Sequence, residues 1–478
     1  MRVDKLFGNL DLARRKGALY TYDLKIKNIV TTCDAAARDT VYVALKTPFG
    51  DGHHGAAAAY SRGCRVFVGS RVMDLPSDAV EYYTPSPELA LATLAAKCYG
   101  EPVRDVTVIG VTGTHGKTSV IDTFAALLRA TGRRVATLTT DGVSYGEHFV
   151  HAGDRAPDAA DLWRFLRLAH REKAEFAVVE FSSYMLAQKA HFSIPFTAVL
   201  LTDYAPRHIG TVHADECSYR AAKQALLESA APLKLLPFDC TALTAVGRVV
   251  RYGSDGEVAL REASPVGREG VALTVDLSGE KAEIFYPVVG DFAYKNALAA
   301  TALAFSVGVS AAEIAQAMPK AAPVGRLERL FTENGKSVYL DAAYEDEDLA
   351  AVLRALRLVT DARLSVVLGS VGGRATERRV SLGDAAFQNA DFVWLTADDA
   401  DAELPQKIAE DIIGEYYNSA AYRICLSRAA AIEAAVADLQ EGDTLLILGK
   451  PREDTQLTRG KKEFFSDRLA VKQALARR

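Results

Sequence analysis

The chain lacks long apolar runs and has few cysteines. None of its uninterrupted apolar runs approaches the ~18 residues of a membrane-spanning helix. Its start, MRVDKLFGNLDLARRKG, carries charges where a signal peptide needs an apolar region. We therefore expect a cytoplasmic protein without a membrane span. The six cysteines are scattered and form no C-x-x-C pair, which argues against a disulfide framework and against a structural zinc site.

A strong net charge is absent as well. The 56 basic and 61 acidic side chains leave a formal charge of -5, so the composition does not point to a nucleic-acid partner. We expect a monomer with small-molecule substrates. A hydrophobic content of 49% with 24% charged residues is ordinary for a globular protein. The 478 residues are too many for one hydrophobic core and predict roughly two to four domains.

Short apolar runs rich in β-branched residues recur along the chain. Continuous rather than alternating apolarity is typical of strands that are covered on both faces, so these runs predict parallel strands of doubly wound α/β sheets. Segments with helical apolar spacing lie between them and predict crossover helices. The predicted strands are Val106–Ile109, Phe176–Val179, Phe196–Leu201, Val338–Leu340, Leu364–Leu368, Phe392–Leu395 and Thr444–Leu448. The predicted helices are Ser119–Ala130, Leu349–Leu358 and Arg428–Leu439.

Breaks in this pattern divide the chain into three predicted domains. The first hundred residues alternate short apolar runs with alanine-rich helical stretches, and the polar break Tyr99-Gly100-Glu101-Pro102 ends them. The segment AAPVGR, residues 321–326, punctuates the pattern again before a new series of strands. The Gly-rich, alternating residues 246–283 predict an antiparallel edge or an insertion. The predicted domains are residues 1–102, 103–322 and 323–478.

Residues 108–119 read VIGVTGTHGKTS, an apolar strand that runs into glycines and a Gly-Lys-Thr. A strand, a glycine-rich turn and a helix that begins near Lys117 gather backbone N–H groups and a helix N-terminus around one point, which favours phosphate binding. Lys117 would reach the β- and γ-phosphates, and the Thr118 hydroxyl would bind magnesium. The strict G-x-x-x-x-G-K-[ST] pattern is not met, because Val111 replaces its first glycine. An ordinary strand–helix turn with an exposed lysine is the alternative.

Polar or glycine residues also follow other predicted strands. In open α/β sheets, ligands bind beyond the carboxyl ends of the strands, so these residues are candidates for a site. Solvated strand ends would give the same pattern. The residues are Glu180, Thr202, Asp203, Asp341, Gly369, Gly372, Gly373, Asp398, Asp399 and Lys450.

Taken in order, these segments resemble the Mur ligases, and most closely the MurE type. TGTHGKTS resembles the family's phosphate loop T-G-T-x-G-K-T, and EFSSYMLAQ resembles its E-V-S-S-H/Q-x-L segment. RHIGTVHADECSYRAAKQALL resembles its D-H-x-x-x-H segment, which ends in Y-x-x-A-K. FAYKNALAA, PVGRLERL and VYLDAAYEDEDL resemble nucleotide-side segments, and LGSVGGRATERR, LTADDADAELP and LGKPRED follow the order of the third domain's motifs. The RHIG and LGSVGG segments are similar to the corresponding segments of the lysine-adding branch.

The resemblance implies an α/β, three-domain Mur ligase architecture. A UDP-substrate-binding domain would precede a central ATP-binding domain with a P-loop-type parallel sheet and a C-terminal Rossmann-like domain that binds the amino acid. ATP and magnesium are the implied cofactors, and the implied substrates are ATP, a UDP-muramoyl peptide and an amino acid. In the implied peptidoglycan-building reaction, a substrate carboxylate attacks the γ-phosphate. The incoming amine then displaces phosphate from the acyl phosphate.

The resemblance also implies roles for individual residues. Lys223, as a neutral amine, can take up CO2 to become a carbamate, although a helix-surface lysine is the alternative; a structural histidine is the alternative for His208. The implied catalytic residues are Lys117, Glu180, His208 and Lys223, and the implied magnesium ligands are Thr118, Glu180 and His208. The implied nucleotide-binding residues are Gly113, Thr114, Gly116, Lys117, Thr118 and Ser119, with Asn296 at the adenine and Arg326 and Asp341 at the phosphates and ribose. The implied substrate-binding residues are Ser182, Asp398, Asp399, Asp401, Glu403, Lys450 and Glu453.

The departures from the family pattern concentrate on the acceptor side. The Asp-Ser-Arg expected to bind the uridine nucleotide is absent from TTCDAAARD, residues 31–39, and Thr-Thr-Pro has become Arg155-Ala156-Pro157. Arg207 stands where the family has an aspartate before the metal-binding histidine. Asp-Tyr-Ala-His has become Asp-Ala-Ala-Tyr at residues 341–344, and Gly-Lys-Gly-His-Glu has become Gly-Lys-Pro-Arg-Glu at residues 449–453.

One departure concerns the amino acid. Diaminopimelate-adding members have Asp-Asn-Pro-Arg, in which the arginine binds the distal carboxylate of the amino acid. Here the segment is Asp-Asp-Ala-Asp, residues 398–401. An aspartate would repel that carboxylate but can pair with a lone distal ammonium, so we infer lysine or ornithine, held by Asp401 and Glu403. An acidic solvated loop is the alternative.

The favoured interpretation is therefore an active ligase that adds a dibasic amino acid to a UDP-muramoyl dipeptide. A related ligase with another acceptor would explain the altered uridine motif. A degenerate homologue that binds ATP and acts as a regulator would explain Arg207, but the phosphate and metal residues argue against it. A plain P-loop ATPase or kinase is the remaining alternative.

Overall fold

The computed structural model describes residues 1–8, 10, 12–16, 23–100, 103, 105–146, 148–151, 155–374 and 376–477. The chain forms two compact units, of which one comprises Met1–Ile121 with Leu128–Gly256 and the other Asp122–Leu127 with Glu257–Arg478. The domain boundary predicted at residue 102 lies outside the described residues. Among the described residues, no helix is both long and apolar enough to cross a membrane.

The first unit begins with a five-stranded sheet in the order β1-β7-β6-β3-β2. Strands β2, β3, β6 and β7 run parallel, and β1 is antiparallel to β7. Its strands are β1 (Ala13–Lys16), β2 (Asn28–Val30), β3 (Thr40–Val43), β6 (Val66–Gly69) and β7 (Val80–Tyr83), and a separate hairpin is formed by β4 (Lys46–Thr47) and β5 (Gly50–Asp51). The helices are α1 (Val3–Phe7), α2 (Ala56–Ser61) and α3 (Pro87–Tyr99).

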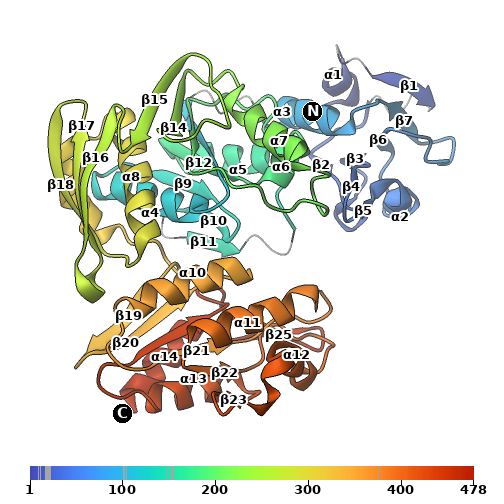
Figure 1. The fold of residues 1–478 in the computed structure, drawn as a ribbon. Coiled ribbons are helices and arrows are strands. Elements are labelled where there is room, and N and C mark those ends of the chain that lie inside the picture. Colours follow the sequence, from blue (N-terminus) through green and yellow to red (C-terminus); the bar gives the residue numbers. More distant parts are fainter. Residues whose placement is uncertain are drawn as a thin grey trace. The chain divides into compact units, whose positions relative to one another are not determined.

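A second sheet of the first unit has the strand order β11-β10-β9-β12-β8-β13-β14-β15 (Figure 1). Strands β9, β12, β8, β13, β14 and β15 are parallel, and β10 and β11 add an antiparallel hairpin. The strands are β8 (Thr107–Thr112), β9 (Val135–Leu138), β10 (Gly142–Tyr145), β11 (His148–His151), β12 (Phe176–Phe181), β13 (Ala198–Leu201), β14 (Leu233–Pro237) and β15 (Arg248–Gly253). The helices are α4 (Lys117–Ala130), whose middle turn belongs to the other unit, α5 (Ala159–Arg171), α6 (Ser183–Ala187) and α7 (Glu216–Leu227).

The second unit contains an antiparallel meander and a six-stranded sheet in the order β19-β20-β24-β21-β22-β23 (Figure 1). In that sheet β19 is antiparallel to β20, and the other pairs are parallel. The strands are β16 (Val258–Pro265), β17 (Val271–Leu277), β18 (Glu280–Tyr286), β19 (Glu328–Glu333), β20 (Lys336–Asp341), β21 (Leu364–Leu368), β22 (Phe392–Leu395), β23 (Tyr422–Ile424), β24 (Thr444–Leu448), β25 (Thr455–Thr458) and β26 (Lys461–Phe464). The helices are α8 (Asp291–Ser306), α9 (Ala311–Ala317), α10 (Asp346–Arg357), α11 (Arg379–Asn389), α12 (Pro405–Ile413), α13 (Arg428–Ala437) and α14 (Asp467–Ala476).

The seven predicted parallel strands are confirmed as strands, with shifts at their ends. β21, β22 and β24 match the predicted residues, and each is buried along most of its length, as strands covered on both faces should be. The antiparallel stretch predicted within residues 246–283 corresponds to β16–β18. β12 continues to Phe181, so Glu180 lies within the strand rather than after it.

Helix α7 shows how the local sequence positions a buried lysine. Asp215 caps its N-terminus, where its side chain accepts the Ser218 N–H in a capping box. Its buried face includes Tyr219, Ala222, Lys223 and Leu226. These positions have the i, i+3, i+4, i+7 spacing of one helix face, so Lys223 is directed into the protein together with apolar neighbours.

His191, which follows α6, is expected to make the free energy of unfolding depend on pH. Burial, reinforced by Lys189, lowers the pKa of His191 from 6.5 to about 4, and within the described structure its Nδ1 atom has no hydrogen-bond partner. The unfolded chain therefore binds a proton between those two pH values while the folded chain does not. We expect this group's stabilisation to be present above pH 6.5 and lost towards pH 4, by at most about 1.4 kcal/mol per pH unit.

Urea unfolding between pH 4 and pH 7 measures this dependence. In His191→Gln the free energy of unfolding should change less with pH across that interval. His148→Gln, at an exposed position of β11, is the matched control and should retain the wild-type dependence. Equal pH dependence in wild type and His191→Gln would contradict the assignment.

Candidate functional site

The glycine-rich loop lies between the carboxyl end of β8 and the start of α4. Gly113 has a φ of 153°, and a Cβ atom there would lie 1.7 Å from the Thr202 hydroxyl oxygen. Only glycine allows this close approach. Lys117 begins α4, and its Nζ donates to the Thr114 carbonyl (2.8 Å). The loop therefore has the strand–turn–helix geometry that the sequence predicted, with Ser119 in the first turn of the helix.

Asp203, at the carboxyl end of the neighbouring strand β13, holds this loop. Its Oδ1 accepts the N–H groups of Thr114 (2.6 Å) and His115 (2.9 Å), and its Oδ2 lies 2.7 Å from the His115 Nδ1. Burial opposes ionisation, but the hydrogen bonds from His115 outweigh it and lower the pKa of Asp203. The sequence placed Asp203 at a strand end, but nothing in it indicated this contact.

Thr118 and Glu180 form the next part of the site. The Thr118 hydroxyl donates to Glu180 Oε2 (2.7 Å), and the Thr140 N–H donates to the same oxygen (3.2 Å). Glu180 is buried. A nucleotide-bound magnesium ion takes one or two protein oxygens together with phosphate oxygens and waters, so this hydroxyl–carboxylate pair fits it. Across the described residues, no group of three or more His, Cys, Asp or Glu side chains is placed to hold a metal ion by itself.

Lys223 lies directly beneath the loop. Its side chain is buried, and its Nζ donates to the Gly113 carbonyl (2.6 Å) and to the Thr112 hydroxyl (3.4 Å). Burial, with the charge of Lys117, holds the pKa of Lys223 well below its usual value. A neutral amine is therefore favoured at this position.

His208 and Ser182 are placed differently from these residues. His208 lies on an exposed loop with a φ of 59°, where its carbonyl accepts the N–H groups of Val212 (3.2 Å) and His213 (3.1 Å). Ser182 caps α6, and its hydroxyl accepts the Met185 N–H (3.2 Å). The structure thus brings Thr118 and Glu180 together. The predicted roles of Thr118, Glu180 and His208 in binding magnesium, and of Ser182 in binding substrate, stay predictions.

The remaining nucleotide-side residues belong to the second unit. Asn296 is partly buried on α8, and Arg326 donates to the Gly325 carbonyl (3.1 Å). Asp341 ends β20, where its two oxygens accept the N–H groups of Leu327 and Ala343, each at 2.7 Å. Burial raises the pKa of Asp341. In this conformation Asp341 organises the backbone around it.

Four predicted substrate residues meet at the carboxyl edge of the six-stranded sheet. The buried Lys450 Nζ lies 2.9 Å from Asp399, 2.5 Å from Glu453 and 3.6 Å from Asp398. Burial disfavours its charge, but Asp398 and Glu453 outweigh burial and raise the pKa of Lys450. Lys450 therefore places one positive charge among these carboxylates, two of which belong to the predicted acidic segment.

Glu403 and Asp401 lie near this edge but have separate partners. Glu403 pairs in two places with the buried Arg379 (2.8 and 2.7 Å), which lowers its pKa to about 2, and it accepts the Gly373 N–H (2.9 Å). Asp401 has a φ of 47° and accepts the Gly460 N–H (2.6 Å). Arg379 was not indicated by the sequence, because a lone arginine on a helix has the pattern of a surface residue.

The two rewritten acceptor-side segments meet in the first unit. The Thr31 hydroxyl donates to the half-buried Asp158 (2.7 Å), and Arg155 pairs with Asp158 (3.3 Å) and with Asp161 (2.6 Å). Burial raises the pKa of Asp158, whereas for Asp161 the charge of Arg155 outweighs burial and lowers the pKa. Thr31 and Arg155 thus share one carboxylate, although they are 124 positions apart in the sequence.

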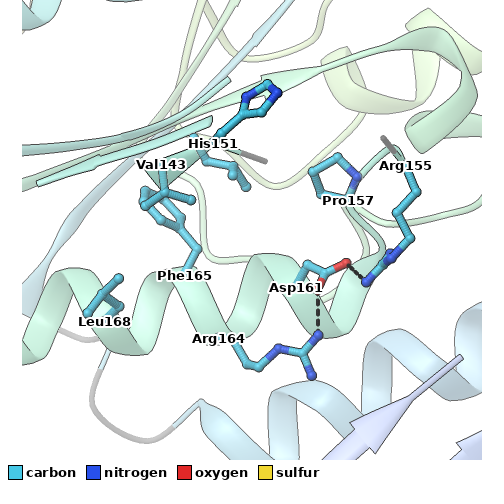
Figure 2. Close-up of a pocket in the computed structure, with 9 residues that line it drawn as sticks. Val143, His151, Arg155, Pro157, Asp161, Arg164, Phe165 and Leu168 are labelled. Carbon is cyan, nitrogen blue, oxygen red and sulfur yellow. Dashed lines mark hydrogen bonds and ion pairs between the residues drawn. The ribbon is translucent and has the colours of Figure 1, made fainter. Parts of the chain in front are cut away.

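A cavity of about 290 Å³ adjoins this cluster. Figure 2 shows Arg155 on one side of Asp161 and Arg164 on its other side, with Val143 and Phe165 towards the opposite end. Most of the wall is apolar. The lining residues are Leu138, Val143, His151, Arg155, Pro157, Asp161, Arg164, Phe165 and Leu168.

Comparison with known proteins identifies the family. The model of the Mur ligase middle domain matches residues 111–304, and that of the Mur ligase glutamate ligase domain matches residues 325–451. The UDP-N-acetylmuramoyl-L-alanyl-D-glutamate--2,6-diaminopimelate ligase of Bradyrhizobium diazoefficiens is 32% identical over 92% of each chain. The enzyme of the same name from Aquifex aeolicus is 30% identical over 94% of each chain.

Solved structures share the fold of this chain. A UDP-N-acetylmuramoyl-L-alanyl-D-glutamate--2,6-diaminopimelate ligase has a TM-score of 0.67 at 19% identity, with 100% of this chain and 99% of that chain covered. A Mycobacterium tuberculosis folylpolyglutamate synthase complexed with ADP has a TM-score of 0.61 at 19% identity, with 82% and 94% covered. The predicted α/β fold of Mur ligase architecture is confirmed, whereas the boundaries at residues 102 and 322 stay predictions. The chain belongs to the Mur ligase family of ATP-dependent ligases, as a divergent member of its MurE type.

Proposed function

We propose that this chain uses ATP to form an amide bond between a carboxylate of UDP-N-acetylmuramoyl-L-alanyl-D-glutamate and an amino acid. The observation that carries the proposal is the convergence of Lys117, the Thr118–Glu180 pair and Lys223 on one phosphate loop. The names of the relatives support the acceptor, since those proteins are ligases of this muramoyl dipeptide.

The chemistry of these side chains suits transfer of a phosphoryl group to a carboxylate. Attack of the carboxylate on the γ-phosphate breaks the bond to the β-phosphate, which releases ADP and gives an acyl phosphate. Attack of the amine on the carbonyl carbon of the acyl phosphate then expels phosphate, and the nitrogen loses a proton as the amide forms. Negative charge accumulates in both steps, so the Lys117 ammonium and the backbone N–H groups of the loop stabilise it. A magnesium ion, when bound, neutralises charge on the phosphates, and Thr118 and Glu180 would hold it.

We further propose that Lys223 becomes a carbamate. Burial lowers the pKa of this amine and so favours its neutral form, which is the form that adds CO2. The product is an anion, which would suit a position beside a metal-bound nucleotide. A CO2-derived mass on the intact protein that is lost with Lys223→Ala supports this step, and its absence in active enzyme would overturn it.

For the amino acid we propose lysine or ornithine. Asp401 supports this choice, because its carboxylate would repel the distal carboxylate of diaminopimelate and attract a lone ammonium. Glu403 contributes less than the sequence suggested, since Arg379 already occupies both of its oxygens. The relatives carry the name of diaminopimelate ligases, so the experiment compares lysine and ornithine with diaminopimelate.

The test measures ATP-dependent phosphate release with magnesium, the UDP-muramoyl dipeptide and a panel of amino acids, with mass detection of the product. We expect turnover with lysine or ornithine and at least about tenfold less with diaminopimelate, which corresponds to one lost charge pair. Asp401→Asn should reduce this ratio. Glu463→Gln, an exposed position on β26, is the matched control and should leave it unchanged.

The outcomes separate the parts of the proposal. Turnover with diaminopimelate but not with lysine would retain the ligase and overturn selection by Asp401. If protein that binds ATP releases no phosphate with any amino acid of the panel, the proposed acceptor is wrong. A ligase with another acceptor would then be favoured, because Asp158 joins the rewritten segments at Thr31 and Arg155, and Arg155 lines a cavity.

A further inference from the structure

Tyr219 contacts both the phosphate loop and Lys223, which the sequence analysis placed in two separate motifs. It lies on the buried face of α7, one helical turn before Lys223. Its hydroxyl lies 2.7 Å from the Thr114 hydroxyl in the phosphate loop. Its ring lies under the Lys223 amine, 5.0 Å from Nζ to the ring centroid. Tyr219 is 1% exposed, so both contacts are made in the interior.

The Tyr219 hydroxyl is one of three hydrogen-bonding groups around the Thr114 hydroxyl. The Thr114 hydroxyl donates to the Ala205 carbonyl (2.7 Å) and accepts the Ala205 N–H (2.9 Å). Its third neighbour is the Tyr219 hydroxyl. Because the carbonyl of the same threonine accepts the Lys117 ammonium, the position of Thr114 decides where the loop and its lysine lie.

The ring contact confines the amine of Lys223. One side of the amine faces the Gly113 carbonyl at 2.6 Å, and the aromatic face covers another. The Tyr219 ring is itself packed by His213, whose ring is perpendicular to it at 5.2 Å between centroids, and by Tyr204 at 5.8 Å. His213 is buried, so this packing leaves the ring little freedom to move.

We propose that Tyr219 is a positioning residue with two separable roles, in which its hydroxyl fixes the phosphate loop for ATP and its ring shields and orients the amine of Lys223. The inference rests on the proposed function in one respect, namely that the loop binds ATP. Tyr219 does not touch the reacting atoms; it acts through Thr114 and Lys223. Removal of the hydroxyl and removal of the ring should therefore have different consequences.

The experiment compares Tyr219→Phe with Tyr219→Leu. Calorimetry gives the Kd for magnesium-ATP, and acetic anhydride labelling followed by peptide mass spectrometry gives the reactivity of Lys223. In Tyr219→Phe we expect the Kd to rise about fivefold, as for one lost hydrogen bond, with unchanged labelling of Lys223. In Tyr219→Leu we expect a similar rise in Kd and about tenfold more labelling, because the amine loses its cover.

Tyr204 supplies a matched control, since its ring lies in the same cluster while its hydroxyl donates to Glu216 (3.4 Å). Tyr204→Phe keeps the ring that packs on Tyr219 and should change neither measurement. Tyr219→Met replaces Tyr219→Leu if circular dichroism shows that the leucine variant does not fold. Equal Lys223 labelling in the Phe and Leu variants, or wild-type affinity for ATP in both, would overturn the proposal.

Neither measurement requires turnover, so failure of the proposed function can be told apart from failure of this inference. A wild type that binds ATP but joins no amino acid to the muramoyl dipeptide would contradict the proposed function and leave the Tyr219 results standing. A wild type that does not bind ATP would contradict both the proposed function and the role of the hydroxyl, while the labelling still tests the role of the ring.

Discussion

Replacement of Lys117 by alanine is expected to lower kcat/KM for ATP about 10²- to 10³-fold. The side chain belongs to the glycine-rich loop that we propose to bind the phosphates, and its ammonium donates to the Thr114 carbonyl at 2.8 Å. Its charge favours the transition state, in which negative charge builds on the transferred phosphoryl group, more than it favours the ground state. Phosphate release at saturating acceptor and varied ATP measures the loss.

The control for this prediction is Lys281→Ala, which removes an exposed lysine from β18 and should leave kcat/KM unchanged. A separate measurement of the Kd for magnesium-ATP shows whether Lys117→Ala acts on binding or on the chemical step. Full nucleotide-dependent turnover in Lys117→Ala would mean that the loop is not the phosphate site, and the proposed function would lose its main support.

Much of the fold could be predicted because buried parallel strands have continuous apolar runs in the sequence. β21, β22 and β24 were predicted to the residue, since strands covered on both faces need continuous apolar side chains. The β10–β11 and β25–β26 hairpins were not predicted. Every residue of β11 and β26 is exposed, so no apolar alternation marks them. Their pairing comes from backbone hydrogen bonds, which leave little trace in side-chain composition.

The candidate site was predicted less completely, for a different reason. Lys117, Thr118 and Lys223 stand in motifs with fixed spacing, which allowed their prediction, but the sequence left a helix-surface lysine open for Lys223, and the structure shows its burial on α7. Arg379 finds its partner Glu403 at a separation of 24 residues along the chain. A pair of charges so far apart is indistinguishable from two surface residues until the fold brings them together. Long-range ion pairs are thus the part of the site that needs the structure.

The largest stability effect is expected from Asp467→Ala, which breaks a buried ion pair in the second unit. Arg428 and Asp467 are 0% and 1% exposed, and two hydrogen bonds join them at 2.7 and 2.6 Å. Arg428 also donates to the Leu448 carbonyl (2.7 Å), so it ties α13 and α14 to the end of β24. Without Asp467 a buried guanidinium remains uncompensated, and we expect a loss of about 3–5 kcal/mol in the free energy of unfolding.

The same two helices carry a natural control. Glu433 on α13 pairs with Arg477, at the end of α14, at 2.7 Å, but both side chains are more than half exposed. Water screens this pair, so Glu433→Ala should cost less than about 1 kcal/mol. Hydrogen exchange of α13 and α14 in the full chain, followed through urea unfolding, measures both variants. Water can replace the partner of an exposed charge but not that of a buried one, so the two variants should differ. Similar losses of unfolding free energy for Asp467→Ala and Glu433→Ala would show that burial of the Arg428 charge does not determine stability here.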